Sequence, residues 1–336
     1  MRVLLFASRT FAIVLGLLVC TTSGFAQACF TADDMDAATR SAIIAAANRY
    51  FDMVARGDAA SIKQNSIPSV ANDFAGIEGT IKENQANLSG AHATARPPFL
   101  LKAEGTAPLP KAEFLCGVFD AQGQTKNSAE FVIPNLPPVT YGVVTLDVPT
   151  QNSGYTVSFV LQQQAADWKV AGFFPRPATI NGHDSNWFIT QARTYKSKGQ
   201  THNAWLYFLQ GRELAMPVPF MYTQVTDKLY EEAQASKPAD FPLDGNTADL
   251  TAAGGKTYKL TAVFPLMVGQ DFDLVVRYQN QDVSNSGATF QENMNVMRAL
   301  LTKFPELRDA FAGVVVRAVE PSGKDYGSMM PMKDIK

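Results

Sequence analysis

The sequence predicts an α+β protein built from three units behind a signal peptide. Apolar residues recur at helical spacing over residues 39–56, and the period changes to two in several segments between residues 99 and 174. Helical and strand patterns then alternate again towards the carboxyl terminus. We therefore expect a signal peptide at residues 1–28 and units at residues 29–178, 179–240 and 241–336.

The amino terminus has the three parts of a secretory signal peptide. Arg2 and Arg9 supply positive charge, residues 11–19 form an apolar run, and residues 26–28 match a small-x-small cleavage site. This run is too short to span a bilayer, and no later stretch reaches about 18 apolar residues. We expect an exported, soluble chain, periplasmic or extracellular, without a transmembrane segment.

The charge balance excludes one class of partner. The chain has 29 Lys and Arg, two of them in residues 1–28, against 31 Asp and Glu, so the mature chain has a formal charge of −4. A mildly acidic chain has no electrostatic basis for binding nucleic acid. A hydrophobic share of 46% is sufficient for a globular core.

Two cysteines remain after the signal peptide, with its Cys20, is removed. In an exported protein Cys29 and Cys116 most simply form one disulfide bond. The alternative is a lipid anchor on Cys29, because this residue directly follows the small-x-small site. Ala26 stands where lipoprotein signals usually have leucine, which favours the disulfide.

The first unit begins with a long amphipathic helix over residues 39–56. Gly57 ends it, and Asp58 is placed to cap a short second helix. Six segments with strand character follow, at residues 99–102, 113–119, 129–133, 140–148, 155–162 and 168–174. The last two are expected to form a hairpin.

This order of elements resembles the SnoaL-like or nuclear-transport-factor-like fold over about residues 37–178. The resemblance lies in the helix that ends in YFDMVARGDAASIK and in the strands that close on WKVAGFF. It implies an antiparallel sheet wrapped as a cone around the long helix, with a mouth that holds a small ligand in some members. Members of this fold range from enzymes to interaction domains, so the fold alone assigns no activity.

The two periodicities predict which residues meet inside such a cone: Tyr50 and Val54 from the helix, and Leu146, Phe159 and Trp168 from the strands. They form either a filled core or the wall of a pocket, for which Tyr50 and Trp168 carry polar groups. Catalytic members usually have an Asp–His or another acid–base pair in the cone. Here only His92 belongs to the unit, in a loop, and no pair with His183 or His202 follows from spacing, so we expect no catalytic residue.

Residues 192–211 match one tetratricopeptide-like helical hairpin. The small and aromatic positions of that pattern are Ala192, Tyr195, Gly199, Ala204, Phe208 and Gly211. A second repeat would place Pro238 inside a helix, so the chain is not a repeat array. A single hairpin must bury its apolar side elsewhere, and we expect residues 186–216 to form a bridge docked against the first unit.

A linker rich in Pro, Ala and Gly leads to a small β-β-α-β unit. Its strands are expected at residues 257–264, 272–278 and 312–319, and its helix is marked by Phe290, Met294, Met297 and Leu301. Three motifs are assigned no chemistry. GGKT at residues 254–257 is a turn, QNQDVSNSG is a solvated loop instead of a calcium site, and SMMPMK is a flexible tail instead of a Cu(I) site.

We therefore expect a non-enzymatic binding or scaffolding protein of the cell envelope, with no cofactor and no metal. Its partner is an unknown envelope protein or a small apolar ligand. The alternative is a carrier or enzyme that uses the pocket of the first unit. A large open cavity with a carboxylate or histidine favours this alternative, whereas a packed helix–sheet core together with an exposed apolar groove favours the first function.

Overall fold

The computed structural model describes residues 27–117, 119–120, 123–124, 127–150, 154–243, 245–269 and 271–336. The predicted signal sequence up to residue 26, with Cys20, lies outside the described residues. The described part has eight α-helices and five sheets, of which only the carboxy-terminal sheet contains a parallel pair. The predicted α+β class is confirmed.

The first two helices of the first unit begin at side-chain caps. Helix α1 (Ala37–Ala55) starts at Asp36, whose carboxylate accepts a hydrogen bond from the Thr39 amide, and α2 (Ala59–Gln64) starts at Asp58 in the same way. Two further helices, α3 (Pro68–Asn72) and α4 (Ala75–Leu88), follow and were not predicted.

Two large sheets and one two-stranded sheet complete the first unit. The larger runs in the order β1 (Gln27–Phe30), β3 (Phe99–Ala103), β8 (Thr140–Pro149), β9 (Gly154–Gln164) and β10 (Asp167–Pro177), with β2 (Thr94–Ala95) also paired to β8. The smaller contains β4 (Leu109–Cys116), β7 (Ala129–Leu136) and β13 (Met221–Tyr222), and β5 (Phe119–Asp120) pairs with β6 (Gly123–Gln124). The predicted hairpin of β9 and β10 is confirmed.

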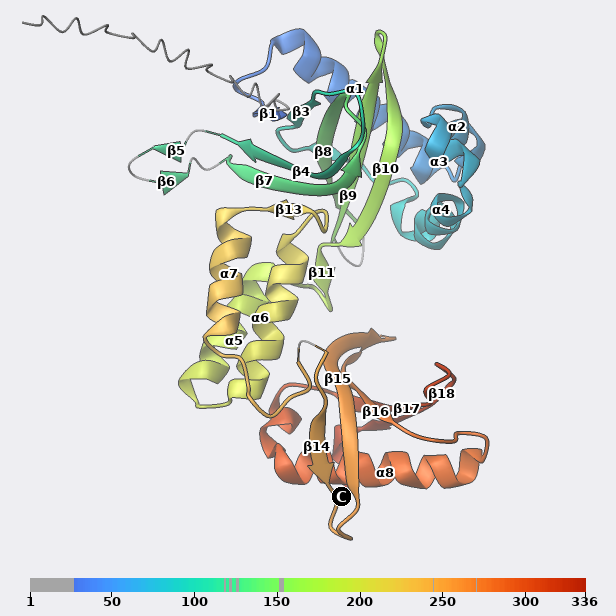
Figure 1. Ribbon diagram of the computed structural model, residues 1–336, viewed down its shortest axis with the longest axis vertical. Coiled ribbons are helices and arrows are strands. Elements are labelled where there is room, and N and C mark those ends of the chain that lie inside the picture. The colour runs from blue at the N-terminus through green and yellow to red at the C-terminus, as the bar shows by residue number, and fades with distance from the viewer. Residues whose placement is uncertain are drawn as a thin grey trace, which may run out of the picture.

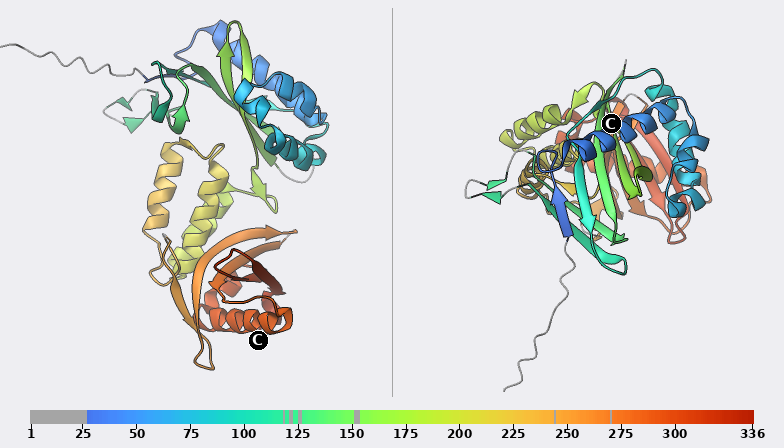
Figure 2. Two further views of the ribbon diagram at one scale, coloured as in Figure 1. Left: turned by 45° about the vertical axis from the view of Figure 1, so that its right-hand side comes forward. Right: turned by 90° about the horizontal axis from the view of Figure 1, so that it is seen from above.

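The larger sheet is the middle of three layers (Figures 1 and 2). Side chains of α1 and α4 share a buried cluster with Val144 and Leu146 of β8. The alternate residue Val143 points to the opposite face and lies in a second cluster with residues of β4 and β7. Both faces of β8 are therefore covered.

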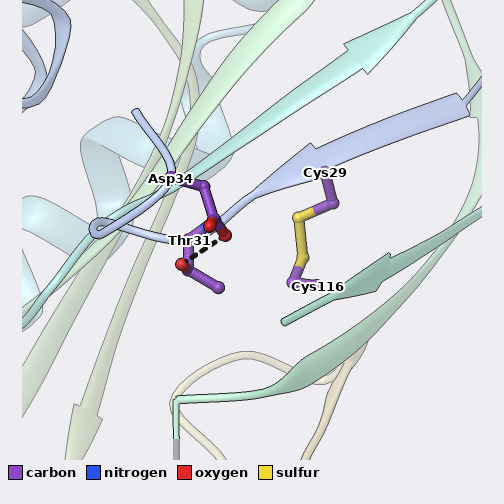
Figure 3. The surroundings of a disulfide bond; sticks show 4 residues. All are labelled: Cys29, Thr31, Asp34 and Cys116. Atoms are coloured by element: carbon purple, nitrogen blue, oxygen red, sulfur yellow. Dashed lines mark hydrogen bonds between the residues drawn. A yellow bond between two sulfur atoms is a disulfide. The ribbon is translucent and has the colours of Figure 1, made fainter. Parts of the chain in front are cut away.

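The Cys29–Cys116 disulfide joins the edge strand β1 of the larger sheet to β4 of the smaller one (Figure 3). Beside it, the side-chain oxygen of Gln27 accepts a hydrogen bond from the Glu113 amide at 2.5 Å. The predicted bond is confirmed. A lipid thioether on Cys29 is incompatible with it, because the sulfur is already bonded. Strand β1 includes Gln27 and Ala28, which precede the predicted cleavage point.

The predicted helical hairpin is formed by α5 (Ser185–Ser197) and α6 (Thr201–Ala215), which follow the short strands β11 (Thr179–Ile180) and β12 (His183–Asp184). Gly211 shows why a small residue is needed: a Cβ at this position would lie 2.9 Å from the Ile189 side chain. A third helix, α7 (Gln224–Gln234), packs Leu229 and Ala233 onto the hairpin and was not predicted.

The carboxy-terminal unit is a five-stranded mixed sheet. Its order is β14 (Ala248–Thr251), β15 (Thr257–Val268), β16 (Asp271–Gln279), β17 (Gly313–Val319) and β18 (Asp325–Pro331). Helix α8 (Ser286–Lys303) and the 3₁₀ turn η1 (Pro305–Asp309) connect the parallel strands β16 and β17. The expected β-β-α-β order is present, with β14 and β18 added. The prediction of a flexible tail at residues 328–333 is wrong, because residues 325–331 pair with β17 and η2 (Met332–Asp334) follows.

The helical unit lies between the other two (Figure 1), but its main core is shared with the carboxy-terminal unit. The Phe272 ring lies 5.3 Å from that of Phe188 and 5.6 Å from that of Tyr207. The Tyr207 hydroxyl donates to the carbonyl of Ala310 at 2.6 Å. The prediction that the hairpin buries its apolar side on the first unit is wrong. The hairpin contacts the first unit through an ion pair between Glu213 of α6 and Arg176 of β10, and the segment after α6 adds the pairing of β13 with β7.

Candidate functional site

The five residues predicted to line a pocket come together in the core between α1 and the larger sheet. Tyr50, Val54, Leu146 and Phe159 are 0% exposed and Trp168 is 4% exposed. The Tyr50 hydroxyl donates a hydrogen bond of 2.6 Å to the backbone carbonyl of Trp168. None of the five lines the cavities described below. A ligand role for these residues stays a prediction.

A cavity does lie on the opposite face of the same strand. Because successive residues of β8 alternate between faces, Val143 and Thr145 point away from α1. The space above them has a volume of about 190 Å³, and we name it the junction cavity. Its walls are Arg96, Pro97, Phe99, Asn127, Ser128, Val143, Thr145, Pro217, Met221 and Thr223.

The floor and the roof of the junction cavity come from different units. The floor is β8 together with Phe99 of β3, whereas Pro217 and Met221 form the roof on the segment after α6. This segment is held in place by β13, where Met221 is the register partner of Phe131, and by a hydrogen bond of 3.0 Å from the Val132 amide to the Phe220 carbonyl. The roof therefore depends on how the helical unit docks.

The exposed wall of the junction cavity is mostly apolar, although five of its ten residues carry polar side chains, and two of these five, Arg96 and Thr145, are held by hydrogen bonds. The hydroxyls of Thr145 and Ser158 are 2.8 Å apart on the buried face, and that of Ser158 lies 3.4 Å from the Pro217 carbonyl oxygen. At the rim, the Arg96 guanidinium donates to both carboxylate oxygens of Asp147 at 2.6–3.1 Å. A mostly apolar wall with a few oriented polar groups is typical of small-molecule sites.

The three histidines lie apart from this cavity. His92 is exposed in the loop after α4, where it lines a separate cavity of about 520 Å³ with Asn87 and Pro149. The His183 ring stacks on Trp187 with centroids 3.7 Å apart.

His202 of α6 is the one histidine that the structure brings between two acids. Its Nδ1 lies 2.6 Å from Glu306 Oε1 and its Nε2 lies 2.8 Å from Asp240 Oδ1. Both ring nitrogens are therefore engaged, and the cluster ties α6 to η1 and to the loop after α7. Spacing could not reveal it, because the partners are 104 and 38 residues away along the chain.

One carboxyl group is buried without a compensating charge. Asp273 of β16 is 2% exposed, and its Oδ1 has no hydrogen-bond partner in the described part of the chain. Burial, and after it the charge of Asp271, raises the pKa of Asp273, while the Gly313 amide opposes this shift. The group lies in the carboxy-terminal sheet, far along the chain from the junction cavity.

In the portion of the chain that the structure covers, no three His, Cys, Asp or Glu side chains are grouped as a metal site would require. No helix in that portion combines the length and the apolar character needed to cross a membrane.

Comparisons of this chain with protein-family models, with curated proteins and with solved structures found no match.

Proposed function

We propose that this chain is an exported binding protein and that the junction cavity is its ligand site. The observation that carries the proposal is the position of the cavity, between a rigid sheet of one unit and a segment contributed by the next. Ligand sites are frequent at such junctions, where apolar walls supply affinity and a few polar groups fix orientation. Export is supported by the signal sequence and by the Cys29–Cys116 bond.

The size and the walls of the junction cavity limit the ligand. A volume of about 190 Å³ is below that of most drug-sized sites, so the ligand is a small molecule or one apolar group of a larger one. Val143, Phe99 and Met221 favour an apolar body, and the Thr145 hydroxyl favours one polar end. The guanidinium of Arg96 is already neutralised by Asp147, so a charged ligand end gains little there.

A SnoaL-like cone remains our proposal for the shape of the first unit. It is supported by the order of elements, in which the long helix α1 precedes an antiparallel sheet and covers one face of it. The proposed ligand site lies on the other face of that sheet. The two proposals are therefore independent, and either can fail without the other.

The test is to fill the junction cavity and to ask whether a bound molecule is lost. The Met221→Trp variant places a large ring in the roof. Leu115→Trp is the matched control, because Leu115 is 61% exposed on β4, two strands away in the same sheet, and lines none of the cavities described. Native mass spectrometry of protein purified from the envelope fraction should show a small bound molecule in the parent and in the control, but not in Met221→Trp. A ligand retained by both variants, or none in the parent, would refute the proposal.

A further inference from the structure

Another cavity lies in the carboxy-terminal unit, between the turn that joins β14 to β15 and one face of α8. Its volume is about 410 Å³, and we name it the turn cavity. Its walls are Thr251, Ala252, Ala253, Gly254, Lys256, Tyr258, Asn295, Arg298, Ala299 and Thr302. We propose that the turn cavity binds a small tetrahedral oxyanion, a phosphate or sulfate group.

The charge of the walls points to an anion. Lys256 and Arg298 are the two charged residues among them, and both are cationic, although the whole chain carries more acids than bases. A different cavity nearby shows the contrast, because its two lysines are balanced by Asp240 and Asp249. Lys256 pairs with Glu292, which is not among the walls, whereas Arg298 has no acidic partner in the described residues, so the walls keep a net positive charge. Positive charge in a concave site attracts anions by focusing the potential.

Arg298 is available to a ligand. Its guanidinium makes no ion pair and no side-chain hydrogen bond within the described part of the chain, and it projects from the exposed side of α8. Asn295 and Thr302 are three residues before and four residues after it, so their polar groups lie on the same helix face. The planar guanidinium donates two parallel hydrogen bonds to an oxyanion, which a single ammonium cannot do.

Lys256 is held in position on the opposite wall. Its ammonium lies 2.7 Å from Glu292 Oε1 and 5.2 Å from the centre of the Tyr258 ring. Glu292 in turn accepts a hydrogen bond from the Tyr258 hydroxyl. The ammonium keeps donors beyond the one that Glu292 uses, because a lysine has three.

The turn itself adds backbone donors. The Ala252 amide donates to the Lys256 carbonyl and the Gly255 amide donates to the Ala252 carbonyl, each at 2.9 Å. The amides of Ala253 and Gly254 make no hydrogen bond in the described part of the chain. Gly255 has a φ of +78°, in the left-handed region, and such glycine turns leave successive amides free to form an anion-binding nest.

The number of these donors favours a tetrahedral oxyanion over a carboxylate. The guanidinium, the ammonium and two amides exceed what two carboxylate oxygens can accept at good geometry, whereas phosphate and sulfate offer four oxygens. The site is not a phosphate-binding loop of the strand–loop–helix type, because the strand β15 follows the GGKT turn. Its donors come from a β-turn and from a helix that is distant in sequence.

Titration with inorganic phosphate tests the proposal. The readouts are the backbone amide resonance of Gly254 and the Nε–H resonance of Arg298, at constant ionic strength maintained with sodium chloride. Saturable shifts of both resonances are expected. Arg298→Gln should weaken phosphate binding about tenfold or more, as the loss of a charge-assisted contact does.

Lys259→Gln is the matched control. This variant removes one positive charge from the neighbouring exposed part of β15, where Lys259 pairs with Asp249. Lys259 is not among the walls of the turn cavity. Phosphate affinity should be unchanged in this variant. The proposal is overturned by shifts that do not saturate, by an equal loss of affinity in both variants, or by acetate that binds as tightly as phosphate.

Discussion

Removal of the Cys29–Cys116 bond is expected to destabilise the first unit by about 4–5 kcal/mol. The two cysteines are 87 residues apart, and the chain-entropy model gives this magnitude for a loop of that length. The bond also joins the edge strand of one sheet to the edge strand of another (Figure 3). Alanine is the replacement of choice, because Cys116 is 0% exposed and a serine would bury a hydroxyl there.

The assay is urea unfolding of the Cys29→Ala/Cys116→Ala double variant beside the parent, followed by circular dichroism. The parent unfolded under reducing conditions is the control, and it should match the double variant. A difference between parent and double variant of less than about 1 kcal/mol would refute the reasoning, since it lies far below the loop-closure value. Two reactive thiols in the denatured, unreduced parent would show that the bond itself is absent.

Three further perturbations test the interior. Tyr50→Phe removes the hydroxyl that donates to the Trp168 carbonyl and should lower the free energy of unfolding by about 1–2 kcal/mol, measured by thermal unfolding. An unchanged free energy of unfolding would show that this hydrogen bond does not contribute to stability. Asp273→Asn should stabilise the protein at neutral pH. Because the pKa of Asp273 is raised, the folded state prefers the protonated acid, and the parent loses stability as pH rises through that pKa. The stabilisation of the variant relative to the parent should therefore vanish at a pH below the ordinary aspartate pKa. Phe272→Ala should cost about 3–5 kcal/mol and should expose the helical and carboxy-terminal units to proteolysis together; release of the helical unit alone would contradict their shared core.

The parts of the fold that follow from local pattern were predictable. The cap at Asp58 and the alternation in β8 and β9 depend on neighbouring residues, and each is found where such patterns place it, whereas the cap at Asp36 was not predicted. Helix α4 was not predicted because it buries only Ile81 and Leu88 and contains two glycines, so its apolar residues show only a weak helical period. Helix α7 likewise buries few residues over a short length.

Long-range pairing could not be predicted from one sequence. Strand β18 carries methionines and polar residues without clear alternation, and it is a strand because β17 offers an open edge. The docking of the hairpin was predicted wrongly because sequence proximity favoured the first unit. The apolar surface that the hairpin packs against is supplied by Phe272 and Phe311, which lie in the third unit. The junction cavity was missed for a related reason. Its roof comes from residues that belong to another unit, and only the helix-facing side of β8 had a visible partner in the sequence.

The pairing of β13 with β7 has a mechanical consequence. The chain leaves the first unit after β10, builds two helices, returns to add β13 to the sheet of the first unit, and then departs again through α7. A force that pulls the two ends of the molecule apart must therefore open this short ladder before the first unit can swing freely on the segment around residue 178. Pro217 and Met221 belong to the segment that this ladder holds, so opening the ladder would also move the roof away from Val143 and expose the junction cavity to solvent.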